Sequence, residues 1–270
     1  MTERCDALLK KREQLRNLLV LRGLAHDPDE AERLVLAAQV SVEGVTITRA
    51  GELVPTEALI EVKPNRRYVS RGGFKLEAAL DDFSIDPTGL NCIDVGASSG
   101  GFSDCLLQRG ALKVCAVDVG YGQFDWKLRE DGRVSLFERT NIAKADPVSL
   151  GAPFDLLVAD LSFTSLARLA SQLVRFVGDE GKLLTLVKPQ FELPKDLVED
   201  GVIRSLDLHV KALEAVVSAY LDEGLAIRGL SHSRLLGAKG NREFWIWAAK
   251  NGVTATIDIV SVVQQAHREL

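Results

Sequence analysis

Apolar and polar positions alternate with two different periods along most of the chain. From residue 90 onward, short apolar runs are separated by longer amphipathic stretches. This alternation is typical of strand–helix–strand units and a mostly parallel sheet. The expected strands cover residues 90–95, 113–117, 134–138, 156–159, 182–187, 226–231 and 243–248. The pattern predicts an α/β fold with a seven-stranded, Rossmann-like sheet.

The end of the chain shows a clear change of period. In the last expected strand, Phe244 and Ile246 alternate with Trp245 and Trp247, so the two pairs should face opposite sides of the sheet. A turn at 240–241 precedes this strand, which is therefore expected to run antiparallel to its neighbour. Beyond residue 251, apolar residues recur at helical spacing. We expect a terminal helix that packs on the domain, with a partner-binding helix as the alternative.

The first part of the chain has shorter elements. Leucines recur at helical spacing from Leu15, Pro28 opens a second amphipathic segment, and Val40-x-Val42 precedes a turn at 43–44. We expect a small α+β domain at 13–62, a basic linker at 63–70, a catalytic domain at 71–251 and a helical tail at 252–270.

Composition narrows the class of protein without identifying it. The 270 residues are 46% hydrophobic and 26% charged, which fits a folded protein. No apolar run approaches the roughly 18 residues that cross a bilayer, and no signal-peptide core follows Met1, so we expect a cytoplasmic protein without membrane contact. The four cysteines form no C-x-x-C pair and are predicted to be structural thiols.

Charge is unevenly distributed along the chain. The net charge is −5, and residues 1–62 carry 8 Lys and Arg against 11 Asp and Glu, whereas residues 63–75 carry five cations and no acid. The cationic stretch is either a solvated linker or a strip that binds RNA phosphates. The candidate RNA-binding residues are Lys63, Arg66, Arg67 and Arg71, with Arg33 on the second expected helix.

A glycine-rich segment follows the first long strand directly. Gly96, Gly100 and Gly101 lie between that strand and a helical stretch, where bare backbone can approach a ligand at the carboxyl edge of the sheet. A dinucleotide fingerprint would have glycine where Ser98 stands. Acids at two strand ends favour S-adenosylmethionine instead. The candidate donor-binding residues are Asp94, Gly96, Ser98, Gly100, Gly101, Phe102, Asp118 and Asn141.

Four polar residues are expected at the same edge of the sheet, namely Lys75, Asp160, Lys188 and Glu243. Such a set beside a methyl-donor site suits the methylation of a ribose hydroxyl. A ribose 2′-hydroxyl is a weak nucleophile, so its attack on a donor methyl group benefits from a positioned base. Lys188 is the candidate base, and Pro189 biases it toward an extended conformation at its strand end. Singly, each residue also fits a structural role, such as a solvated lysine or a strand-end cap. The histidines show no metal-binding spacing, and no metal is expected.

Several motifs occur in a fixed order. The segments are 68–76, 94–102, 118–123, 160–163, 186–192 and 240–244. Together they resemble the TlyA-type family, some members of which are called hemolysins, over roughly residues 13–268. The resemblance implies an FtsJ-like domain, with a seven-stranded Rossmann-like sheet of the class I methyltransferase type, that methylates ribose 2′-hydroxyls of ribosomal RNA. It also implies that Lys75, Asp160, Lys188 and Glu243 are the catalytic tetrad.

The N-terminal segment resembles a second family. Residues 15–62 are similar to the small RNA-binding domain of ribosomal protein S-four, which implies ribosomal RNA or ribosomal subunits as partners. That family places basic residues on its second helix, where this chain has acids at 27–30 and retains Arg33. Besides a methyltransferase, the sequence leaves open an RNA-binding ribosome-associated factor with little turnover and a membrane-active hemolysin. It indicates no oligomeric state.

Overall fold

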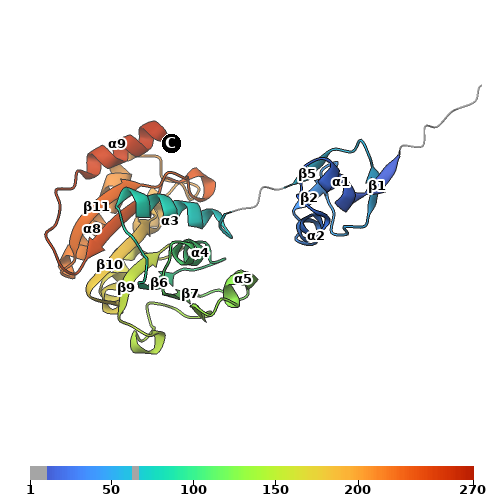
Figure 1. The fold of residues 1–270 in the computed structure, drawn as a ribbon. Helices are drawn as coiled ribbons and strands as arrows, with labels where there is room; N and C mark the ends of the chain where they lie inside the picture. Colours follow the sequence, from blue (N-terminus) through green and yellow to red (C-terminus); the bar gives the residue numbers. More distant parts are fainter. Residues whose placement is uncertain (1–10, 63–66) are drawn as a thin grey trace, which may run out of the picture. The chain divides into compact units, whose positions relative to one another are not determined.

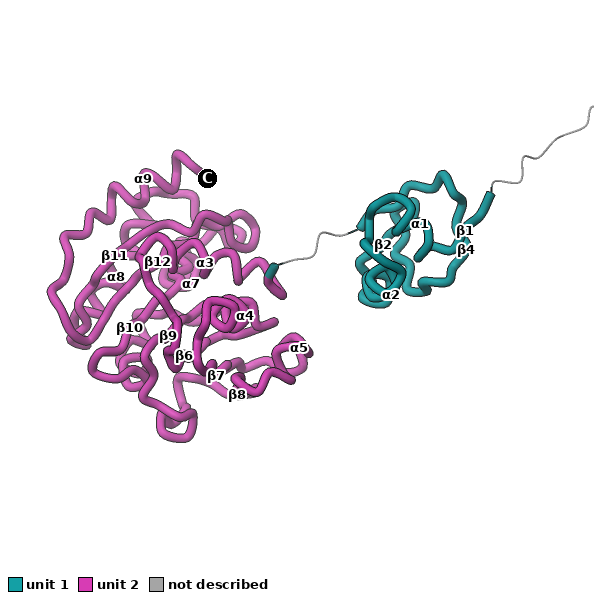
Figure 2. The backbone as a smooth tube through the Cα atoms, viewed as in Figure 1, with its two compact units in different colours: residues 1–67 teal, residues 68–270 magenta. Residues whose placement is uncertain are grey.

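The chain folds into two compact units, residues 1–67 and 68–270 (Figure 2). The computed structural model describes residues 11–62 and 67–270. Of the predicted linker, positions 63–66 lie outside the described residues. Tyr68 is fully buried in the second unit, where its hydroxyl donates to Glu77 Oε1 at 3.0 Å.

The first unit combines two helices with small antiparallel strand pairs (Figure 1). Asp27 starts the second helix by accepting a hydrogen bond from the Glu30 N–H at 2.7 Å. The helices follow the predicted pattern, but the pairing of β1 with β4 was not predicted because these short strands show no clear alternation. The elements are α1 (Leu15–Leu21), α2 (Pro28–Leu36), β1 (Arg12–Gln14), β2 (Val40–Val42), β3 (Val45–Thr46), β4 (Leu53–Pro55) and β5 (Ile60–Val62).

A seven-stranded sheet forms the centre of the second unit, in the order β11-β12-β10-β9-β6-β7-β8. Strands β10, β9, β6, β7 and β8 run parallel, and β12 runs antiparallel to both of its neighbours. The predicted sheet and its antiparallel last strand are confirmed. The strands are β6 (Asn91–Val95), β7 (Lys113–Val117), β8 (Val134–Phe137), β9 (Phe154–Ala159), β10 (Val177–Val187), β11 (Ala226–His232) and β12 (Phe244–Ala249).

Two separate hydrophobic cores cover the faces of this sheet. One contains residues of α6, α8 and α9, and the other contains residues of α3, α4 and α5. Phe244 and Ile246 enter the first core and Trp245 enters the second, as their alternation predicts. The helices are α3 (Arg71–Asp82), α4 (Gly101–Gln108), α5 (Trp126–Arg129), α6 (Leu166–Leu173), α7 (Pro189–Glu192), α8 (Leu206–Asp222) and α9 (Ile259–Glu269). Cys92, Cys105 and Cys115 are buried, and within the described part of the chain none of the three forms a disulfide.

Strand direction brings the polar residues of interest to one edge. Asp118, Asp160 and Lys188 follow the parallel strands β7, β9 and β10, so they share the carboxyl edge of the sheet. Because β12 is antiparallel, the residue before it, Glu243, lies at that same edge. Ser70 caps α3 by accepting from the Gly72 N–H at 3.3 Å, and the helix then presents Lys75 in its second turn.

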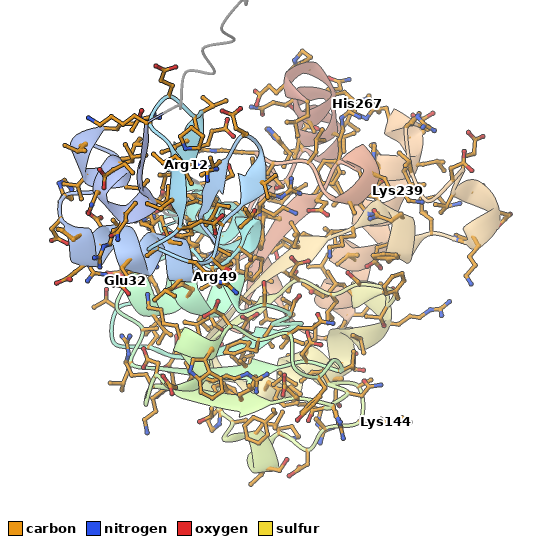
Figure 3. The ribbon with its side chains drawn as sticks, turned by 90° about the vertical axis from the view of Figure 1, so that its right-hand side faces the viewer. Arg12, Glu32, Arg49, Lys144, Lys239 and His267 are labelled. Atoms are coloured by element: carbon orange, nitrogen blue, oxygen red, sulfur yellow. The ribbon has the colours of Figure 1, made fainter. Side chains whose placement is uncertain are left out.

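The terminal helix α9 packs on α8 and β11, as predicted. His267 of α9 (labelled in Figure 3) lies with its Nε2 2.9 Å from Nδ1 of His209, which is fully buried on α8. Arg242 donates from Nε to the carbonyl oxygen of Ala266 at 3.2 Å. Burial, together with the nearby His267 and Arg242, lowers the pKa of His209 to about 4. His209 is therefore held in its neutral form.

This burial predicts a pH-dependent stability of the second unit. The unfolded state protonates His209 near pH 6.5 and the folded state only near pH 4, so stability is lost as the pH falls through this window. The loss should reach about 3 kcal/mol. Urea unfolding measures the free energy of unfolding of the native chain and of a His209→Leu variant. The difference between the two should fall by that amount from pH 7 to pH 4. A difference that stays constant with pH would contradict the assignment.

Candidate active site

Lys75 and Glu243 form the more deeply buried of two ion pairs at the carboxyl edge. Their Nζ and Oε2 atoms are 2.5 Å apart, and the side chains are 9% and 3% exposed. Burial raises the pKa of Glu243, while Lys75 opposes the rise. Gly237 packs so tightly on this carboxylate that a Cβ there would lie 2.0 Å from Oε1. The loop before β12 thus closes over the pair.

The second ion pair joins two neighbouring strand ends. Lys188 Nζ lies 2.5 Å from Asp160 Oδ1 and donates to Ser162 Oγ at 3.0 Å. Lys188 and Asp160 are 12% and 23% exposed, so this pair is more open than the first. Asp160 and Lys188 also act electrostatically on Glu243, so the two pairs form one cluster. The structure therefore brings all four predicted tetrad residues together.

A cavity of about 520 Å³ opens beside this cluster. Asp118 is central to it: Oδ2 accepts from the Ser98 N–H at 2.8 Å and Oδ1 accepts from the Gly120 N–H at 2.6 Å. Gly96 has φ +85°, and a Cβ there would lie 2.6 Å from the carbonyl oxygen of Asp160. Only glycine permits this close approach. The cavity thus adjoins Asp160 of the tetrad.

The predicted donor-binding residues divide into two groups. Gly96, Ser98, Asp118 and Asn141 line the cavity, and Asp94, Gly100, Gly101 and Phe102 do not. Asp94 instead accepts from the Ser103 N–H at 2.9 Å and the Ser103 hydroxyl at 2.7 Å, and full burial raises its pKa to about 7. Asp94 therefore holds the first turn of α4 against β6.

The three remaining residues of the glycine-rich segment have packing contacts. A Cβ on Gly100 would lie 2.5 Å from the Leu128 side chain, and one on Gly101 would lie 2.1 Å from Ser70 Oγ. Phe102 contacts the Trp245 ring at a centroid distance of 5.6 Å. The segment therefore packs helices together as well as forming one wall of the cavity.

Sequence reasoning missed part of the cavity wall. Leu161, Ser162 and Phe163 line it, from the loop that follows β9. Gln123 also lines the cavity, and all four residues lie in the motifs 118–123 and 160–163, which were the available signal. The residues after Asp160 gave no periodic signal because loop conformation depends on tertiary contacts rather than on an apolar repeat.

A second cavity, of about 810 Å³, shares Phe163 and Thr164 with the first. Phe163 is 91% exposed, and its ring contacts that of Phe191 at 5.2 Å. Arg168 and Lys195 contribute cations to the lining. Gln190 and Phe191, which follow Lys188 in the sequence, also line this cavity. The two cavities therefore adjoin at Phe163 and Thr164.

The candidate RNA-binding residues are placed as follows. Arg71 is exposed at the start of α3, with Nη2 3.5 Å from the carbonyl oxygen of Leu236. Arg33 and Arg67 are exposed, each within its described segment, whereas Lys63 and Arg66 lie outside the described residues. Within residues 11–62 and 67–270, no group of three or more His, Cys, Asp or Glu side chains could hold a metal ion.

The sheet order and the site at its carboxyl edge define a class I methyltransferase fold. Residues 68–250 match the FtsJ-like methyltransferase family, and the chain belongs to that family. Its similarity to a TlyA protein, the 16S/23S rRNA (cytidine-2′-O)-methyltransferase of Mycobacterium tuberculosis (strain CDC 1551 / Oshkosh), is 42% identity over 232 residues, covering 85% of this chain and 87% of the relative. The family resemblance drawn from the motifs is confirmed.

Two further relatives match almost the full length. A candidate rRNA methyltransferase of Bacillus subtilis (strain 168), YqxC, is 38% identical over 273 residues, covering 97% of both chains. The solved structure of a candidate hemolysin from Streptococcus thermophilus is 37% identical, with a TM-score of 0.73, and the match covers 96% of this chain and 97% of that one. The likeness therefore includes both units.

The buried ion pair predicts a strong stability coupling. Lys75→Met or Glu243→Leu alone should lower the free energy of unfolding by about 3 to 5 kcal/mol, because each leaves an unpaired buried charge. The double variant should recover most of the loss. Denaturant titration of both singles and the double measures this, with Arg133→Ala as the control: it breaks the exposed pair with Asp131 and should cost below about 1 kcal/mol. Additive losses in the double variant would refute the coupling.

Proposed function

We propose that the protein transfers a methyl group from S-adenosylmethionine to a ribose 2′-hydroxyl of ribosomal RNA. The observation that carries this proposal is the clustering of Lys75–Glu243 and Lys188–Asp160 beside a cavity that opens at the carboxyl edge. A reaction that needs a positioned hydroxyl and no metal suits such a cluster. The names of the similar TlyA proteins support the same reaction and substrate.

The first cavity suits the donor. Its walls supply an acidic group at the end of β7, a glycine turn after β6 and a polar loop after β8. Each oxygen of Asp118 accepts one backbone N–H and keeps a second acceptor position, which suits the hydroxyls of a nucleoside. Asn141 and Thr140 line the end where an adenine edge would bind. The bound donor supplies a methyl group on a positively charged sulfur.

The tetrad orients the acceptor hydroxyl. Lys188 is the more exposed lysine and reaches toward Ser162, which lines the donor cavity. We assign the hydroxyl and its proton to Lys188, and Asp160 fixes the direction of the Lys188 side chain. Lys75 and Glu243 form the buried bottom of the site. As the new carbon–oxygen bond forms, the bond from carbon to sulfur breaks and the hydroxyl proton leaves to the amine.

RNA reaches this site from the side of the second cavity in this proposal. The exposed Phe163 ring offers a stacking surface for an unpaired base, and Arg168 and Lys195 offer charges for phosphates. Arg71, four residues before Lys75, adds a further exposed cation. The first unit, which resembles the S-four RNA-binding domain, provides a second contact with ribosomal RNA.

Two other functions have weaker support. An RNA-binding factor without turnover would not need the two lysine–carboxylate pairs. A membrane-active role is suggested by the hemolysin names among the similar proteins. Among the helices of residues 11–62 and 67–270, none is both long and apolar enough to cross a bilayer. Dye release from phospholipid vesicles, measured beside methyl transfer, separates the membrane-active reading from the enzyme.

Donor binding should depend on Asp118. Replacing it with alanine removes a carboxylate that lines the cavity and frees the Ser98 and Gly120 N–H groups that it holds. Charged hydrogen bonds contribute about 1.5 to 3 kcal/mol each, so affinity for S-adenosylmethionine should fall at least about tenfold. Calorimetry tests this, with the exposed Glu130→Ala as the control. Equal affinities for Asp118→Ala and the native chain would remove Asp118 from the donor site.

Methyl transfer should depend on Lys188 more strongly than folding does. Lys188→Ala should slow single-turnover transfer by about 10²- to 10⁴-fold, the usual loss of a general base. Lys188→Arg should not restore it, because a guanidinium stays protonated. Tritiated-methyl incorporation into ribosomal subunits measures both variants. Lys182→Ala, on the same strand β10, is the control. A near-native rate of methyl transfer by Lys188→Ala would show that another group acts as the base.

A further inference from the structure

The loop that joins β9 to α6 is held in an unusual conformation. This β9–α6 loop, residues 160–165, carries Asp160 and Ser162 and contributes to both cavities. At its centre, Phe163 has φ +64°. A bulky residue rarely occupies the left-handed region, and such strain persists only where surrounding contacts fix it. The contacts at the two ends of the loop must therefore determine where Asp160 and Ser162 lie.

One short segment fixes both ends. Lys188, the residue before α7, bonds Asp160 and Ser162 at the start of the loop. Glu192, the last residue of α7, binds the end of the loop: Oε2 accepts from Ser165 Oγ at 2.6 Å. Between them the Phe191 ring contacts Phe163. The segment and the loop are thus joined at three successive points.

Glu192 also caps a helix that is not its own. Its Oε1 accepts from the Leu166 N–H at 2.7 Å, and its Oε2 accepts from the Ala167 N–H at 3.3 Å. These two N–H groups belong to the first turn of α6, where helical N–H groups lack partners and negative charge is favoured. Three donors thus converge on one carboxylate. A glutamine at this position would direct its amide N–H groups toward the donor groups that Glu192 now accepts from.

We propose that Glu192 is a positioning residue that holds the β9–α6 loop so that Asp160 and Ser162 meet Lys188. It touches neither of the two ion pairs and acts through Ser165 and the first turn of α6. This role adds a residue to the proposed function. The activity measurement that tests it therefore rests on that function. Because the same loop lines the donor cavity, Glu192 also supports donor binding.

The test compares Glu192→Ala and Glu192→Gln with Asp196→Ala, which removes an exposed carboxylate four residues further along. At saturating RNA and S-adenosylmethionine, Glu192→Ala should lower kcat at least about tenfold. Sodium formate should restore part of kcat, because it returns a carboxylate to the vacated space at α6. Glu192→Gln should lose activity without rescue, since its side chain fills that space. Asp196→Ala should match the native chain.

Hydrogen exchange provides a readout without catalysis. In both Glu192 variants, the amides of Leu166 and Ala167 should exchange faster than in the native chain. If the native chain transfers no methyl group to ribosomal RNA, the proposed function fails, and exchange still decides the role of Glu192. Native kcat and native exchange in Glu192→Gln would overturn the proposal, as would lost activity in a folded Glu192→Ala that formate does not restore. If Glu192→Ala does not fold, Glu192→Gln decides.

Discussion

Burying a lysine is unfavourable unless a carboxylate reaches it, and this constraint acts twice at one edge of the sheet. Lys75 comes from a helix on one face and Glu243 immediately precedes an antiparallel strand, so their pairing fixes α3 against β12. Lys188 and Asp160 follow adjacent parallel strands, and their pairing fixes two loops. Each pair holds together elements that are distant in the sequence, and the proposed chemistry uses both.

Close backbone packing places the cavity that we propose for the donor beside these pairs. Gly96 lets the turn after β6 approach the end of β9, where a side chain would strike the carbonyl oxygen of Asp160. Gly237 similarly lets its loop close on Glu243. In both places the absence of a Cβ lets a loop approach a residue of the predicted tetrad. The acceptor hydroxyl and the donor methyl can be brought in line only if these approaches are close.

Strand positions, the antiparallel last strand and the gathering of the four tetrad residues could be predicted from sequence, because apolar alternation and strand direction determine them. The orientation of Asp94 could not be predicted, since a carboxylate near the end of a strand can face either the cavity or the Ser103 hydroxyl of α4. The roles of Phe163 and Glu192 also escaped prediction, because contacts between loops leave no periodic signal. The family resemblance indicated which residues matter, and the structure shows their contacts.

The chemical position of the transferred methyl group tests this account most directly. Ribosomal subunits lacking the modification would be incubated with the protein and deuterium-labelled S-adenosylmethionine. The RNA would then be digested to nucleosides, and its fragments resolved by mass spectrometry. The account predicts that the label stays with the ribose fragment after the glycosidic bond breaks and that Lys188→Ala removes it. A label on the base fragment, formed by the native protein and retained in Lys188→Ala, would contradict ribose methylation by this site.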